Sequence, residues 1–269
     1  MNPLPSPHEE PGSFVQANGL RLYIETHGTG TPIILIHGGL ETCRMWDPAI
    51  PALSANYKLI TPDSRGHGRS DNPTGQFSYP LMATDMVQLI QALGIERPFI
   101  AGYSDGGQVA LEMAIAYPGL ARGFLIGGIY NTLTDAWNQM MCGPLGFDAP
   151  GVVDFERVAQ LNSTFITELR EKHEPYHQPG YWKTLLTGLS SSWLNPPNHS
   201  PADFAKIVDP SLFWCGDRDV FCPPEQSLEM YRIVKGAELA VFPDADHFTI
   251  ANQFDGIVAM MQNFITKYL

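Results

Sequence analysis

Cysteine is scarce in this chain, and the few cysteines show no spacing that carries chemistry. Cys43, Cys142, Cys215 and Cys222 are scattered and lack the CxxC pattern, so neither a zinc site nor a disulfide framework is indicated. Scattered cysteines are typical of reduced thiols in a cytoplasm. We therefore expect a cytoplasmic protein that carries no metal.

Long apolar runs and clusters of basic residues are also lacking. Runs such as PIILIHGG (32–39) stop well short of the roughly 18 residues that a membrane helix needs. Residues 1–12 are polar and rich in proline, without the basic and apolar regions of a signal peptide, so we expect a flexible tail. Acidic residues number 28 against 16 basic ones, for a net charge of -12. We expect neither a membrane nor nucleic acid as a partner.

Two patterns alternate along the rest of the chain. Asn18-Gly19 lies between two extended segments and predicts a β-hairpin. Continuous apolar runs follow at 57–63, 97–104, 121–129 and 211–217, as in strands that are buried on both faces of a parallel sheet. Segments 78–95, 105–119, 224–235 and 254–269 have helical periodicity. This alternation predicts an α/β fold with a central parallel sheet.

The alternation stops between about residues 130 and 206. No apolar strand run occurs there, and the aromatic residues are scattered among proline and glycine. A structureless loop of this length is improbable in a compact domain, and 152–172 has helical periodicity. We predict a helical cap at 130–206, inserted into a core formed by 13–129 and 207–269. Most of the cap aromatics are expected to form the cap's own core.

Ser104 is the candidate nucleophile. It lies in Gly102-Tyr103-Ser104-Asp105-Gly106, a G-x-S-x-G pattern that follows an apolar run and opens a helix. Such a serine projects from a sharp turn, and flanking glycines let the neighbouring chain pass close. The start of the helix also offers free N–H groups and positive partial charge to a developing oxyanion.

A hydroxyl needs a base and an orienting acid, and the C-terminal half supplies candidates for both. Asp219 follows the apolar run 211–216, and His247 follows the run 238–242. Strand ends are where sites form in open sheets, and the order serine, acid, histidine is that of α/β-hydrolases. Asp217 is the rival acid, since a sequence cannot measure which carboxylate reaches the imidazole.

The chain resembles the α/β-hydrolase family in IHGGLET, DSRGHGRS, GYSDGGQVAL, GDRDVFCPP and DADHF. The resemblance implies a mostly parallel eight-stranded sheet with helices on both faces and a cap after the sixth strand. It favours Asp219 as the acid and assigns the oxyanion hole to the amides of Gly39 and Asp105, with Leu40 as the alternative to Gly39. It also implies structural roles for His37 and His67.

Substrate contacts are less defined by the sequence. Leu40, Tyr103 and Trp137 are candidate substrate-binding residues. The elbow GYSDGG is similar to that of valacyclovirase-type amino-acid ester hydrolases, which suggests that Asp105 engages a substrate ammonium, although a carboxylate at a helix start is also favoured by the dipole. His173 and His177 are four residues apart, but Pro175 between them disfavours a helical metal site.

These features predict a cofactor-free serine hydrolase that cleaves a small-molecule carboxylic ester or lactone through an acyl-enzyme. A C–C bond hydrolase, an aminopeptidase or a haloperoxidase-like enzyme would use the same scaffold. Epoxide hydrolases and haloalkane dehalogenases of this fold use an aspartate nucleophile, and position 104 is serine. A small-molecule receptor built on the same fold is the alternative outside enzymes. The sequence leaves the oligomeric state open.

Overall fold

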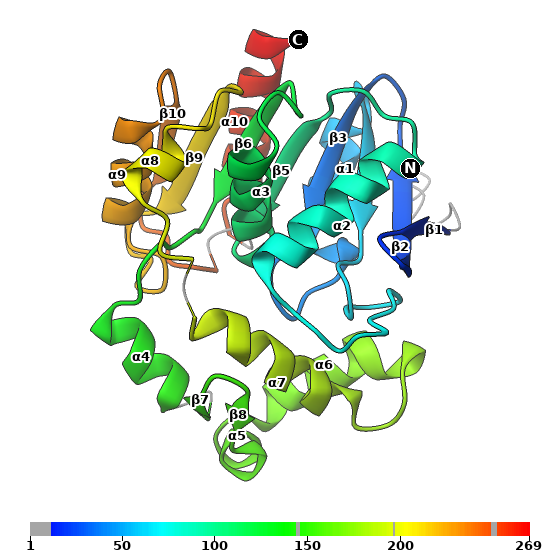
Figure 1. The fold of residues 1–269 in the computed structure, drawn as a ribbon, viewed down its shortest axis with the longest axis vertical. Coiled ribbons are helices and arrows are strands. Elements are labelled where there is room, and N and C mark those ends of the chain that lie inside the picture. Colours follow the sequence, from blue (N-terminus) through cyan, green and yellow to red (C-terminus); the bar gives the residue numbers. More distant parts are fainter. Residues whose placement is uncertain (1–11, 144–145, 196, 249–251) are drawn as a thin grey trace, which may run out of the picture.

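The computed structural model describes residues 12–143, 146–195, 197–248 and 252–269 (Figure 1), so the predicted N-terminal tail falls almost wholly outside the described residues. Its main sheet consists of β1 (Ser13–Ala17), β2 (Leu20–His27), β3 (Thr31–Ile36), β4 (Tyr57–Pro62), β5 (Phe99–Tyr103), β6 (Gly123–Gly127), β9 (Ser211–Gly216) and β10 (Glu238–Phe242). The order across the sheet is β1-β2-β4-β3-β5-β6-β9-β10. The first two strands are antiparallel to their neighbours, and all later pairs are parallel.

Helices cover both faces of this sheet, which confirms the predicted fold class (Figure 1). The helices of the core are α1 (Ile50–Leu53), α2 (Tyr79–Ala92), α3 (Asp105–Ala116), α8 (Pro201–Phe204), α9 (Pro224–Ile233) and α10 (Phe254–Tyr268), with a 3₁₀ turn η1 (Cys43–Trp46). Ile34 and Ile36 pack in the core with α2 and α3, whereas Ile33 and Leu35 pack in a second core with α1 and α10. Successive side chains point to opposite faces, so a strand covered on both sides is apolar throughout.

The predicted hairpin is confirmed. Asn18 and Gly19 have φ angles of 48° and 78°, the left-handed pair that a two-residue hairpin turn requires. Residues Ser13 to Ala17 pair in register with Ile24 to Leu20.

The described part of segment 135–193 lies beyond the carboxyl ends of the strands, whereas α8, which falls inside the predicted cap 130–206, lies beside α9 (Figure 1). It contains α4 (Asp135–Cys142), α5 (Phe155–Leu161), α6 (Ser163–His173), the 3₁₀ turn η2 (Glu174–Tyr176) and α7 (Tyr181–Trp193). Two features differ from the expected helical cap. Strands β7 (Phe147–Ala149) and β8 (Val152–Val153) form an antiparallel ribbon, and the helical segment 152–172 is broken at Asn162, whose side chain accepts from the N–H of Phe165. Both strands are too short to give a periodic signal.

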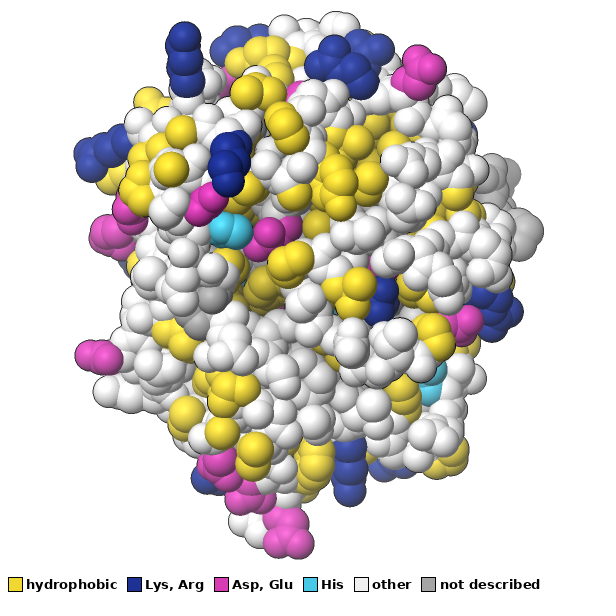
Figure 2. All heavy atoms as spheres, in the orientation of Figure 1, with side chains coloured by type: hydrophobic (Ala, Val, Ile, Leu, Met, Phe, Trp, Pro, Cys, Tyr) yellow, Lys and Arg dark blue, Asp and Glu magenta, His cyan; other side chains and the backbone are white. Residues whose placement is uncertain are grey.

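On the face that Figure 2 shows, Lys and Arg side chains are scattered rather than gathered into one patch. Among the helices of the described residues, none has the length and apolar character needed to cross a membrane.

Candidate active site

Ser104 lies on the turn between β5 and α3 in a strained conformation, with φ 56° and ψ -123°. Glycine is required on both sides because the chain passes too close for a side chain. A Cβ on Gly102 would lie 2.1 Å from the carbonyl oxygen of Gly106, and one on Gly106 would lie 2.2 Å from that of Ile36. The N–H of Ser104 donates to Gly127 at 2.9 Å, which fixes the turn against β6.

His247 connects Ser104 to Asp219. Its Nε2 lies 2.9 Å from Ser104 Oγ, and its Nδ1 lies 2.8 Å from Asp219 Oδ2. The other carboxylate oxygen of Asp219 accepts from the N–H groups of Phe221 and Cys222 at 2.9 and 2.7 Å. With both oxygens held, the carboxylate presents one oxygen to Nδ1, which places the ring proton there and leaves Nε2 free to accept from the serine hydroxyl.

The rival acid has a different role in the structure. Asp217 is exposed and accepts from the N–H of Ala245 at 3.1 Å, a bond that lowers the pKa of its carboxyl. Asp217 therefore stabilises the turn that precedes His247 by accepting this backbone hydrogen bond. The buried Asp219 is the carboxylate that contacts the imidazole.

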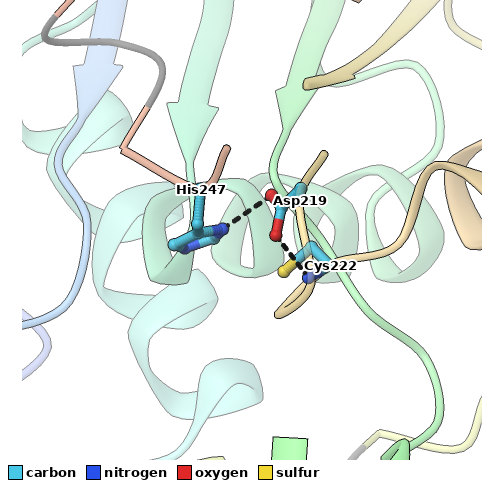
Figure 3. A group of neighbouring side chains, drawn as sticks. All are labelled: Asp219, Cys222 and His247. Atoms are coloured by element: carbon cyan, nitrogen blue, oxygen red, sulfur yellow. Dashed lines mark hydrogen bonds and ion pairs between the residues drawn. The ribbon is translucent and has the colours of Figure 1, made fainter. Parts of the chain in front are cut away.

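Cys222 lies beside the same carboxylate (Figure 3). Asp219, Cys222 and His247 each offer one potential metal-ligand atom, and these atoms lie within 4.8 Å of one another. However, burial holds the pKa of the thiol well above its usual value, and a thiol must ionise to bind a metal tightly. Both oxygens of Asp219 are already engaged, so the donor set suits a hydrogen-bonded pair better than an ion. The expectation of no metal stays a prediction.

The backbone amides of Gly39 and Asp105, the predicted oxyanion hole, donate to no acceptor within the described residues. Asp105 is the first residue of α3, so its N–H has no partner inside the helix. The N–H of Gly39 makes no hydrogen bond within the described part of the chain. Leu40, the predicted alternative, instead donates its N–H to His67 Nε2 at 3.3 Å, so that amide is already used. A Cβ on Gly39 would lie 2.5 Å from Asp105 Oδ2, and glycine is needed here because of that neighbour.

The side chain of Asp105 is turned away from solvent. Trp193 Nε1, at the end of α7, donates to both carboxylate oxygens at 2.8 and 2.9 Å, and Tyr79 donates its hydroxyl proton at 2.9 Å. Burial raises the pKa of the Asp105 carboxyl to about 6 despite these donors. A substrate ammonium would have to compete with Trp193 for this carboxylate, so the ammonium hypothesis gains no support from the geometry.

A pocket of about 300 Å³ reaches Ser104 and His247. Its lining residues all belong to the core segments: Gly38, Gly39, Glu41, Met45, Tyr103, Ser104, His247, Phe248 and Phe254. The predicted contact Trp137 does not line it and packs between Tyr130 and Phe221, with ring centroids 4.5 and 5.6 Å away. Leu40 is buried and does not line it either. Met45 and Phe254 were missed because no motif or periodicity marks them.

Tyr103 lines this pocket, but its strongest contacts are with His247. Its ring stacks on the imidazole at 5.3 Å and on Trp214 at 4.7 Å. Its hydroxyl donates to the carbonyl oxygen of His247. Burial holds the pKa of Tyr103 well above its usual value, so the phenol stays a donor. These contacts indicate that Tyr103 holds His247 in position. They are more direct evidence for that role than for substrate binding.

Replacing Tyr103 by phenylalanine is expected to lower kcat about threefold to thirtyfold and leave KM within about twofold. The ring stack remains, but loss of a hydrogen bond worth about 1 kcal/mol loosens the backbone that carries the base. Steady-state kinetics with an ester substrate would measure kcat and KM separately. A rise in KM at unchanged kcat would instead identify Tyr103 as a substrate-binding residue.

Apart from His247, no histidine of the described residues belongs to a group of potential metal ligands. His37 accepts from the N–H of Ser64 at 2.9 Å, and His67 lies 3.0 Å from the carbonyl oxygen of Arg65. Both are buried, and burial lowers the pKa of His37 to about 4 and that of His67 to about 3. Each of these uncharged imidazoles therefore hydrogen-bonds to the backbone of a loop. His173 points to Leu40, whereas His177 stacks on Tyr181.

Comparison with known proteins places this architecture in a large family. A family model described as the alpha/beta hydrolase family matches residues 33–259. The 2-hydroxy-6-oxo-2,4-heptadienoate hydrolase of Pseudomonas putida is 25% identical over 95% of this chain and 96% of its own length. A meta-cleavage product hydrolase from Pseudomonas fluorescens superposes with a TM-score of 0.76 at 24% identity, over 96% and 98% of the two chains.

Esterases share the fold as well. A thermophilic esterase from Thermogutta terrifontis superposes with a TM-score of 0.73 at 22% identity, over 96% of this chain and 99% of the other. At these identities the structural likeness concerns the fold, whereas the family model covers most of the sequence, including the regions of Ser104, Asp219 and His247. The chain belongs to the alpha/beta hydrolase family.

Proposed function

We propose that this protein hydrolyses uncharged carboxylic esters or lactones through an acyl-enzyme formed on Ser104. The observation that supports this most directly is the hydrogen-bonded series from Ser104 Oγ through both nitrogens of His247 to Asp219. Nucleophile, base and orienting acid are thus within reach of one another before a substrate binds.

In the proposed reaction, His247 Nε2 takes the hydroxyl proton as Ser104 Oγ attacks the carbonyl carbon. The oxygen of the tetrahedral intermediate accepts from the N–H groups of Gly39 and Asp105. The intermediate expels the alcohol, which takes the proton from the imidazolium. His247 then removes a proton from water, hydroxide attacks the acyl-enzyme, and Ser104 leaves with that proton restored.

The preference for an uncharged substrate rests on the lining of the pocket. Met45, Phe248 and Phe254 give it an apolar wall, Glu41 contributes a carboxylate, and none of its lining residues is a lysine or arginine. A buried carboxylate, Asp105, also lies behind Gly39. Apolar walls bind apolar groups. An anionic substrate would find no lysine or arginine among the lining residues, and Lys172, which contacts Glu41 at 2.6 Å, is already paired with that carboxylate.

A C–C bond hydrolase is the second candidate. It is favoured by the likeness to the heptadienoate hydrolase, which extends over nearly the whole of both chains. That enzyme's name describes a carboxylate substrate, and the absence of a cationic side chain among the lining residues of the described pocket argues against the same substrate here.

The test is a panel of p-nitrophenyl esters of increasing acyl length, assayed with the protein and with Ser104→Ala. We expect measurable turnover that falls at least about 10⁴-fold in the variant. Ser163→Ala, at the exposed start of α6, serves as the matched control and should keep full activity. Turnover of a dienoate with no ester turnover would favour the second candidate. Tight binding of small molecules without turnover would favour a receptor.

A further inference from the structure

The residue after Gly39 has an unusual backbone. Leu40 has a φ of 62°, a left-handed conformation that a leucine adopts only when its surroundings impose it. Its side chain is 8% exposed. Because Leu40 follows the residue whose N–H we assign to the oxyanion hole, its conformation sets the course of the oxyanion loop, which we define as residues 37–41.

Two histidines hold the backbone of Leu40 from both sides. Its N–H donates to His67 Nε2 at 3.3 Å, and its carbonyl oxygen lies 3.1 Å from His173 Nε2. Both imidazoles are fully buried, and their ring centroids lie 5.7 Å apart. Each polar backbone group of this strained residue therefore has an imidazole as its partner.

The neighbours of His173 fix which nitrogen carries its proton. Nδ1 accepts from the N–H of Gly68 at 2.9 Å, so in the neutral ring the proton lies on Nε2, which then donates to Leu40. Burial lowers the pKa of His173 to about 3, which keeps the ring neutral near pH 7. The tautomer needed to hold Leu40 is the one that Gly68 imposes.

His173 comes from the segment inserted between β6 and β9. It is the last residue of α6, and the residue before it makes a parallel contact, since Lys172 Nζ lies 2.6 Å from Glu41 Oε1. Two consecutive residues of α6 thus hold two consecutive residues of the oxyanion loop. The ion pair is part-exposed and contributes little, so the buried imidazole is the stronger constraint.

We propose that His173 is a positioning residue for the oxyanion hole, through which the inserted segment holds Leu40 in its left-handed conformation and so aims the amide of Gly39. The inference rests on the proposed acyl transfer at Ser104. Without the imidazole, Leu40 relaxes toward an ordinary conformation, and the Gly39 amide no longer points at the carbonyl oxygen of the substrate.

The experiment compares an ester with its thionoester in the full-length protein and in His173→Ala. Sulfur accepts hydrogen bonds poorly, so the ratio of the two kcat/KM values reports on the oxyanion hole. We expect kcat for the ester to fall at least tenfold in His173→Ala, with KM changed less than threefold, and the ratio of ester to thionoester to fall at least fivefold. A merely structural role would lower both rates equally and leave the ratio unchanged.

A second variant tests the backbone itself. Leu40→Gly should restore part of the lost activity when combined with His173→Ala, because glycine adopts the left-handed conformation without strain. His177→Ala is the matched control, since His177 lies four residues from His173 and contacts Tyr181 and the backbone of Gly68, but holds neither polar backbone group of Leu40. It should leave the ratio within about 1.5-fold of that of the unmodified protein.

The outcomes separate this inference from the proposed function. If His173→Ala keeps the ratio, or if His177→Ala lowers it as much, the positioning role is wrong while ester hydrolysis at Ser104 stands. If the unmodified protein turns over no ester, both are wrong. If His173→Ala is too unstable to assay, His173→Phe gives the same comparison, because its ring fills the space of the imidazole but cannot donate to Leu40, so the ratio should fall as in His173→Ala.

Discussion

Replacing Asp219 by asparagine is expected to lower kcat by about 10⁴, because the amide can donate to Nδ1 and stabilise the wrong tautomer of His247. The fold should survive, since the asparagine oxygen can still accept from the N–H groups of Phe221 and Cys222. Steady-state kinetics with the best ester of the panel would measure the effect, and circular dichroism would confirm that the variant is folded.

Asp217→Asn is the matched control for that experiment. The residue lies two positions away, is exposed and accepts only from the backbone near His247, so kcat should stay within about threefold. A loss at Asp217 that equals the loss at Asp219 would mean that local loop geometry, and not the orientation of the imidazole, accounts for the result.

Lowering the pH from 7 to 5 is expected to destabilise the protein by several kcal/mol. Burial lowers the pKa of His37 to about 4 and those of His67 and His173 to about 3, against about 6.5 in the unfolded chain. Below pH 6.5 these histidines therefore bind protons in the unfolded chain but stay neutral in the folded protein. As a result, the free energy of unfolding at pH 5 is lower than at pH 7 by about 2 kcal/mol per histidine.

Asp105 acts in the opposite direction, though more weakly. Its folded pKa is raised to about 6, so the folded protein takes up a proton there as the pH falls to 5, which stabilises it by about 1 kcal/mol. Urea unfolding at both pH values would measure the net loss. His173→Gln should be less sensitive to pH by about 2 kcal/mol. Equal stability of the unmodified protein at pH 7 and 5 would show that these histidines are not held neutral.

The sequence was most informative where local pattern and local structure coincide. The apolar runs became the strands, the G-x-S-x-G pattern became the strained turn at Ser104, and Asn18-Gly19 became the hairpin. In each case a few adjacent residues determine the backbone, because burial on both faces or a positive φ leaves few alternatives.

Contacts between distant segments were not predictable in this way. Trp193 and Asp105 are separated by 88 positions, and His173 and Leu40 by 133. No periodicity marks such pairs, since they depend on how the inserted segment packs on the core. In the sequence, only the spacing from His177 marks His173. In the structure, His173 lies on α6 and contacts Leu40 of the oxyanion loop. The break at Asn162 had a local signal, because asparagine is a favoured helix N-cap.

The pairing of β6 with β9 has a consequence for how the chain folds. These neighbours lie side by side in the sheet, with Phe124 opposite Ser211, although roughly 80 residues separate them, and closing a loop of that length costs about 2 kcal/mol more entropy than closing one of ten residues. Contacts between residues so distant in sequence also slow folding. We therefore expect β1 to β6 to associate early and β9 and β10, which bring Asp219 and His247 to Ser104, to join them late.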